Sequence, residues 1–217
     1  MNGDGEPSPE RSEEPGEFYP AVGIGPRPQP WPEGEQWDPD LLANGDRRNV
    51  VDRYRYWTID AIKADLDKTR SGLHVAVENW QHDLNIGSIV RTANAFNVAA
   101  VHIVGRRAWN RRGAMVTDKY MHVLHHPSVT DFHAWADERG TPIVGVEQVP
   151  GSVPLGEFKF PRECAILLGN EGIGLTPEAL TICASLVEIP QFGSTRSINA
   201  AAAGAIAMWA YHVRSDA

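Results

Sequence analysis

The chain has 217 residues, two cysteines and a net charge of −8, which suits one sizeable folded domain with an appendage. No apolar run reaches the roughly 18 residues that a membrane helix needs, and the acidic, Pro-rich start is unlike a secretory signal. Cys164 and Cys183 lie in apolar surroundings, so we expect buried thiols in a reducing, cytoplasmic compartment and no disulfide.

The negative charge is concentrated in residues 1–46, which hold 11 Asp/Glu, two Arg and 9 of the 16 prolines. Such a segment cannot bury enough apolar surface to offset its ordering entropy. We predict a disordered arm, or an extended one that packs only locally through aromatic residues such as Trp31 and Trp37. The rest of the chain carries 18 Lys/Arg against 17 Asp/Glu, so RNA binding by it is not excluded.

Residues 47–72 form a second segment, basic and aromatic at its start and helical after it. Thr58 is a favourable N-cap for a helix that we expect to reach Lys68. The cluster before this helix offers cations for phosphates and rings for stacking on bases, and Arg53 and Arg55 are its candidate RNA contacts.

From residue 73 onward, short apolar runs alternate with helical patterns. This alternation predicts an α/β domain over residues 73–217, with a parallel sheet flanked by helices on both faces. A short helix should begin at Thr176, because Pro177 suits the first helical position. The expected strands are 73–79, 99–105, 141–149, 165–170 and 186–190, and the expected longer helices are 86–96, 131–139 and 197–212.

Three short strings in this domain follow or end expected strands. They are NIGSIVRTA (85–93), LLGNEGIG (167–174) and IPQFGSTRSIN (189–199). The second is a Gly-rich turn in which Gly169 allows close approach of a ligand, but it lacks the GK[ST] and GxGxxG patterns of phosphate and dinucleotide loops. The third opens the last helix, for which Ser197 is a candidate cap.

In this order, the three strings resemble the signature motifs of the SpoU (TrmH-like) branch of the SPOUT methyltransferases. The resemblance covers residues 71–214. It implies a homodimer that moves a methyl group from S-adenosylmethionine to a ribose 2′-hydroxyl of RNA. It also implies the SPOUT α/β knot, in which residues 143–214 form a deep C-terminal trefoil knot, a rare exception among chain topologies.

The resemblance assigns catalysis to a small group of polar residues. The reaction requires that the 2′-oxygen be placed in line with the methyl carbon and made a better nucleophile. Arginine rarely loses its proton, so we prefer stabilisation of developing alkoxide charge by Arg91 over action as a base. The full set is Asn85, Arg91, Glu171, Ser197 and Asn199.

The same resemblance places the cofactor against the ends of three strands. Main-chain groups of Ile189 and Ile198 are expected to contact the adenosine. Where the family commonly reads SLNVS, this chain reads SINAA, which removes a serine at Ala201. The expected cofactor contacts are Val146, Gly169, Asn170, Ile189, Gln191 and Ile198.

The stretch 106–120 is the main candidate for RNA contact, because it interleaves cations with Trp109 and Tyr120. Arg196, beside Ser197, could hold a phosphate of the target. The candidate RNA-binding cations are Arg53, Arg55, Arg106, Arg107, Arg111, Arg112 and Arg196.

Several alternatives stay open. We favour guanosine in tRNA as the substrate, while rRNA or the tRNA wobble position would suit the same core. The departure at SINAA keeps a catalytically silent RNA-binding protein of this fold under consideration. A general doubly wound nucleotide enzyme fits poorly, because NWQHDLNIG lacks its Gly-rich turn. No metal is expected, because His122, His125 and His126 lack the spacing of zinc motifs.

Overall fold

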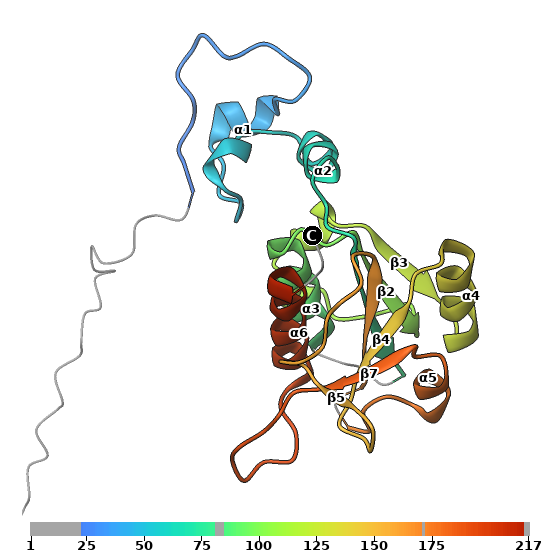
Figure 1. Ribbon diagram of the computed structural model, residues 1–217. Helices are drawn as coiled ribbons and strands as arrows, with labels where there is room; N and C mark the ends of the chain where they lie inside the picture. The colour runs from blue at the N-terminus through green and yellow to red at the C-terminus, as the bar shows by residue number, and fades with distance from the viewer. Residues whose placement is uncertain (1–22, 81–84, 171, 215–217) are drawn as a thin grey trace, which may run out of the picture. The chain divides into compact units, whose positions relative to one another are not determined.

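The computed structural model describes residues 23–80, 85–170 and 172–214. The chain divides into two compact units, one ending at Trp57 and the other beginning at Thr58 (Figure 1). None of the described helices is long and apolar enough to cross a membrane.

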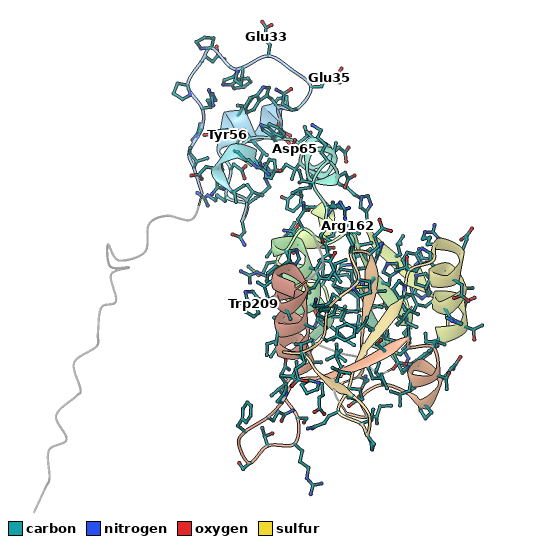
Figure 2. All side chains as sticks on the ribbon, viewed as in Figure 1. Glu33, Glu35, Tyr56, Asp65, Arg162 and Trp209 are labelled. Carbon is teal, nitrogen blue, oxygen red and sulfur yellow. The ribbon has the colours of Figure 1, made fainter. Side chains whose placement is uncertain are left out.

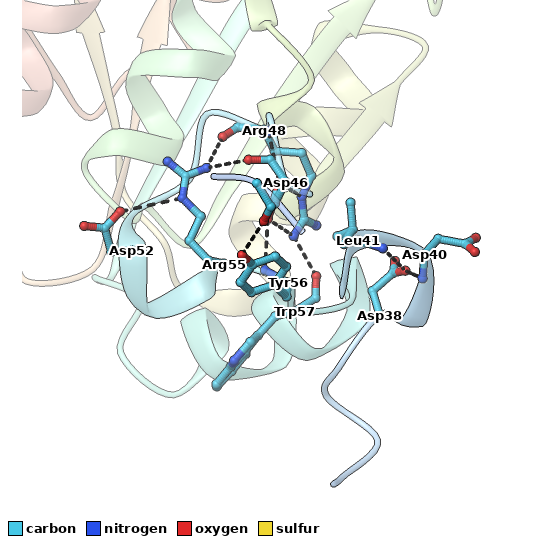
Figure 3. Close-up of polar contacts among 10 residues, drawn as sticks. Asp38, Asp40, Leu41, Asp46, Arg48, Asp52, Arg55, Tyr56 and Trp57 are labelled. Carbon is cyan, nitrogen blue, oxygen red and sulfur yellow. Dashed lines mark hydrogen bonds and ion pairs between the residues drawn. The ribbon is translucent and has the colours of Figure 1, made fainter. Parts of the chain in front are cut away.

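The first unit is organised around Asp46, whose carboxylate is fully buried. The Arg48 guanidinium donates to it at 2.7 Å and the amide of the buried Tyr56 donates at 3.0 Å (Figures 2 and 3). Burial alone would raise the pKa of Asp46, but these hydrogen bonds lower it to about 2. Asp38 caps helix α1 (Pro39–Asn44) by accepting from the amide of Asp40 at 3.0 Å.

Arg55, one of the predicted RNA contacts, makes polar contacts within the same unit. Its guanidinium donates to the carbonyl of Arg48 at 2.6 Å and lies 3.6 Å from the Asp52 carboxylate (Figure 3). Bridges that join residue 24 to 46 and residue 37 to 57 close the unit. Its contacts therefore run across the expected boundary at residue 46, while residues 1–22 lie outside the described part of the chain.

The second unit is built on a parallel sheet. Its strands are β1 (Leu73–Asn79), β2 (Ala100–Gly105), β3 (Val123–His126), β4 (Ile143–Val146), β5 (Val153–Pro154), β6 (Cys164–Leu168) and β7 (Ser185–Glu188). The seven strands follow the order β3-β2-β1-β6-β4-β7-β5. Val75 of the central β1 pairs with Val101 of β2 and with Ile166 of β6. The five predicted strands are confirmed as β1, β2, β4, β6 and β7, whereas β3 and β5 were missed.

Helices cover both faces of the sheet, as predicted. They are α3 (Asn85–Ala95), α4 (Val129–Arg139), α5 (Pro177–Thr181) and α6 (Ala200–Arg214), while α2 (Ile59–Asp67) precedes β1. Figure 1 shows α3 and α6 on one side of the sheet and α4 and α5 on the other. Each side has its own apolar core, with Ile89 and Met208 in the first and Phe132 and Ala179 in the second.

Side-chain caps set the start of several helices. The predicted caps Thr58 and Thr176 are confirmed, since each accepts a hydrogen bond at 3.2 Å from the amide three residues later. The predicted start of the last helix at Ser197 is wrong. Asn199 caps α6 instead, because its side-chain oxygen accepts from the amide of Ala201 at 2.9 Å.

A chain of three histidines, of which His102 and His126 are buried and His74 is half-buried, crosses β1, β2 and β3. His74 Nδ1 lies 3.0 Å from His102 Nε2, and His102 Nδ1 lies 2.9 Å from His126 Nε2. Burial lowers the pKa of His74 to about 4 and that of His102 to about 2, and it also lowers the pKa of His126. The chain is therefore neutral at physiological pH, and Phe132 and Trp135 pack against it.

Candidate cofactor pocket and active site

A pocket of about 270 Å³ opens at the carboxyl ends of β4, β6 and β7. Ligands of open α/β sheets bind at this edge, outside the carboxyl ends of the strands. Three segments line the pocket: residues 146–148 after β4, the loop 168–174 after β6, and a stretch from 189 into the start of α6.

The loop after β6 is closed by its own backbone. The amide of Asn170 donates to the carbonyl of Gly174 at 3.0 Å, and the amide of Gly174 donates back at 2.8 Å. A Cβ at Gly169 would collide with the backbone of Gly174. Gly174 itself has φ +69°, which favours glycine. Both glycines are thus required for the shape of this pocket wall.

Two carboxylates hold the far end of this loop. Glu147, which lines the pocket, accepts from the amide of Leu175 at 2.8 Å. The buried Glu78 of β1 accepts from the amide of Thr176 at 2.8 Å and from its hydroxyl at 2.7 Å. Sequence reasoning missed Glu147; its only signal was a carboxylate directly after the strand that ends at Val146.

The interior of the pocket combines apolar walls with one unpartnered acceptor. The side-chain oxygen of Gln191 is buried, and no described residue donates a hydrogen bond to it. A buried acceptor without a donor costs about 1–3 kcal/mol, so a ligand with an N–H group would relieve that cost. The apolar lining residues are Val146, Leu168, Ile173, Ile189, Ile198, Ala200 and Ala203.

The structure brings together most of the residues singled out in the sequence. All six expected cofactor contacts line this one pocket, and so do Ser197 and Arg196. Asn199 donates to the side-chain oxygen of Asn85 at 2.8 Å, although the two residues are 114 positions apart in the chain. The first and third motifs therefore meet at this hydrogen bond. Glu171 lies outside the described residues.

Arg91 lies apart from the pocket lining, on the exposed side of α3. No described residue forms a hydrogen bond or ion pair with its guanidinium, so its charge is uncompensated there. The basic stretch after β2 packs on the same helix. A Cβ at Gly87 would lie 2.8 Å from the carbonyl oxygen of Asn110, so only a glycine admits this close contact.

The other predicted RNA contacts are mostly exposed. Arg106, Arg107, Arg111 and Arg112 all face solvent. Arg111 lies 5.4 Å from the centre of the Trp109 ring and 3.2 Å from the Asp118 carboxylate. In the first unit, the exposed Arg53 lies 4.5 Å from the centre of the Tyr54 ring.

The three histidines considered for zinc have three different partners. His122 contacts Asp67, His125 contacts the carbonyl of Gly105, and His126 belongs to the buried histidine chain. Within the described part of the chain, no three side chains are grouped as a metal site would require.

Comparisons with known proteins agree with this geometry. Residues 72–209 match the SpoU rRNA Methylase family. The chain is 31% identical over 155 residues to a tRNA (guanosine(18)-2'-O)-methyltransferase of Mus musculus, in a match that covers 68% of this chain and 10% of that protein. It is 29% identical over 176 residues to a 23S rRNA (uridine(2479)-2'-O)-methyltransferase of Streptomyces viridochromogenes, covering 75% of this chain and 61% of the relative.

Among solved structures, the SpoU methyltransferase AviRb from Streptomyces viridochromogenes in complex with the cofactor AdoMet is similar. It superposes with a TM-score of 0.60 at 29% identity, over 69% of this chain and 61% of that one. The chain thus spans less than two thirds of the length of each of these three relatives.

Proposed function

Because this chain belongs to the SpoU rRNA methylase family, we propose that it transfers a methyl group from S-adenosylmethionine to a ribose 2′-hydroxyl of RNA. One observation carries the proposal. Residues chosen from the second and third motifs line a single pocket, and the Asn199–Asn85 hydrogen bond of 2.8 Å joins that pocket to the first motif.

The pocket residues fit the proposed cofactor. Ile189 and Ile198 offer apolar surface to an adenosine, and the unpartnered oxygen of Gln191 can accept from an amino group. The carboxylate of Glu147 brings negative charge to a pocket that would hold a sulfonium cation. When bound, the cofactor supplies the methyl group. A bound AdoMet in the similar AviRb structure supports this assignment.

Arg91 has the chemistry required at the acceptor hydroxyl. Its guanidinium is exposed and none of the described side chains pairs with it, so it is available to stabilise negative charge that develops on the ribose oxygen. Asn85 and Asn199 hold the mouth of the pocket against the start of α3. Ser197 lines the pocket beside them, and Glu171 keeps its proposed organising role.

RNA would be held by the cations around this site. The exposed arginines belong to the loop after β2, and the backbone of that loop packs against Gly87 of α3, the helix that also carries Arg91. Arg196 lines the pocket and suits a phosphate next to the target ribose. In the first unit, Arg53 is a separate candidate for RNA contact, whereas the bonds of Arg55 within that unit give it a structural role.

We favour guanosine in tRNA as the substrate, as in the name of the mouse relative. Ribosomal RNA is the second candidate, favoured by the name of the Streptomyces relative.

We also propose a homodimer formed through the exposed apolar side of α6, where Ile206, Trp209 and Val213 recur at helical spacing. Trp209 lies on the side of α6 away from the sheet (Figure 2). The free thiols of both cysteines suit the cytoplasm.

The test is to incubate the protein with methyl-labelled S-adenosylmethionine and unmodified tRNA or rRNA, and then to map the labelled nucleotide. We expect label on a ribose 2′-oxygen in tRNA. Cofactor binding without transfer to any RNA would instead favour a catalytically silent RNA-binding protein. Absence of cofactor binding, with RNA present or absent, would contradict the assignment of the pocket.

A further inference from the structure

Two large apolar side chains are exposed around the candidate cofactor pocket. Phe192 has 97% of its surface exposed and Ile173 has 63%. Phe192 lies in the loop between β7 and α6, which projects beyond the sheet at the lower left of Figure 1. Ile173 belongs to the loop after β6 and itself lines the pocket.

The position of Phe192, more than its exposure, requires an explanation. Single exposed apolar residues are ordinary on protein surfaces. Here, however, Phe192 directly follows Gln191 in the chain and precedes Arg196 by four positions, and both of these residues line the pocket. Because Ile173 is both highly exposed and part of the lining, it lies at the pocket mouth. The two loops that form the pocket walls thus each present an apolar side chain to solvent.

The residues around Phe192 indicate the chemistry of its partner. Arg196 is exposed, and no described residue forms a hydrogen bond or ion pair with it. The loop is otherwise short and polar, with Ser194 and Thr195 exposed, so it offers no broad apolar surface to a lipid or a protein. An exposed ring beside an exposed cation in the sequence suits a nucleotide, whose base has an aromatic face and whose phosphate is anionic.

We infer that Phe192 stacks on the base of the nucleotide whose ribose is methylated, while Arg196 contacts its phosphate. The inference rests on the proposed methyl transfer to RNA and adds the residue that receives the base. Stacking is available with any base, because every base has an aromatic face. Phe192 therefore increases the affinity for the target nucleotide, whereas contacts made by other residues determine which base is selected.

The test compares three substitutions at one position with a matched control elsewhere. Phe192→Ala should raise KM for an unmodified tRNA transcript roughly 10- to 100-fold, with a smaller change in kcat. Phe192→Trp should restore KM, whereas Phe192→Leu, which is apolar but lacks a ring, should not. The affinity for S-adenosylmethionine, measured by calorimetry without RNA, should stay within about twofold in all three variants.

Leu124→Ala is the control, since Leu124 is 40% exposed on β3, at the other edge of the sheet. This variant should leave both KM and cofactor affinity unchanged. In a second experiment, a photoreactive phenylalanine analogue at position 192 should crosslink to the methylated nucleotide or its immediate neighbour.

The outcomes separate this inference from the proposed function. If the wild-type protein methylates RNA but Phe192→Ala keeps its KM, or the crosslink maps to a distant nucleotide, the role of Phe192 is refuted and the methyl transfer stands. If Phe192→Ala changes the oligomeric state and leaves KM unaltered, the ring belongs to an interface between copies of the chain, which also overturns the inference. A wild-type protein that methylates no RNA would overturn both.

Discussion

Mild acid should destabilise this protein through the histidine chain that crosses β1, β2 and β3. The pKa of His102 is about 2 in the folded protein and 6.5 without the fold. As the pH falls below 6.5, His102 therefore takes up a proton in the unfolded state but not in the folded state. The contribution of His102 to the free energy of unfolding is complete above that pH and is lost on acidification. His74 and His126 act in the same direction, because burial lowers their pKa values too.

The expected loss can be estimated from His102 alone. A pH of 5 lies 1.5 units below the unfolded pKa of 6.5, and each unit corresponds to about 1.36 kcal/mol. His102 should thus remove about 2 kcal/mol of folding free energy between pH 7 and pH 5. His74 acts over the same pH interval, because its folded pKa of about 4 also lies below pH 5.

Urea unfolding followed by tryptophan fluorescence would measure this loss, at several pH values and one fixed protein concentration. In His102→Leu, the difference in unfolding free energy between pH 7 and pH 5 should shrink by about 2 kcal/mol. His133→Gln is the matched control. His133 is half-exposed on α4 and is not a member of the histidine chain. Its replacement should leave the pH dependence of the unfolding free energy unchanged.

The reasoning fails if the His102 ring, followed by NMR, titrates near pH 6.5 in the folded protein. It fails equally if His102→Leu shows the same pH dependence as the wild type. The buried Asp46 does not confuse the result, because its pKa is lowered from 3.8 to about 2. Its contribution to stability is lost only at lower pH, as the pH falls from its unfolded value toward its folded one.

Three further predictions concern the pocket and the acceptor site. Gly169→Ala places a Cβ against the backbone of Gly174, so calorimetry should detect at least a tenfold loss of cofactor affinity; unchanged affinity would show that this loop is not part of the cofactor site. Gln191→Leu removes the unpartnered acceptor and should weaken cofactor binding by roughly 3- to 10-fold without lowering the unfolding midpoint, whereas tighter binding would contradict the assigned hydrogen bond. Arg91→Ala should lower kcat by about 100-fold or more while cofactor affinity stays within twofold, and activity near wild type would refute its role.

The sequence predicted the central strands because burial on both faces leaves an unbroken apolar run. β1 and β6 lie next to each other at the middle of the sheet, and both are almost entirely buried. The missed strands, β3 and β5, are the two edges of the sheet. A short edge strand has only one neighbour and one protected face, so its composition resembles that of a loop.

The pocket was predictable through family motifs, and the contacts that shape it were not. In the sequence, a carboxylate after a strand, such as Glu147, cannot be distinguished from a solvated acid. Its role follows from the structure, in which it accepts a hydrogen bond from the amide of Leu175 at 2.8 Å. Likewise, Ser197 and Asn199 are both reasonable helix caps, and only the three-dimensional start of α6 selects Asn199. These choices depend on partners distant in sequence, which local patterns do not encode.

The side-chain amide of Asn199 links the start of α6, beside the cofactor pocket, to the start of α3, beside the proposed RNA site. Its oxygen fixes the first turn of α6, while its nitrogen holds Asn85 at the first turn of α3. Loosening the loop before α6 would therefore also release the front of α3, on which we place the acceptor RNA. Binding of the methyl donor should then favour binding of the acceptor, and linkage requires the benefit to be mutual and equal.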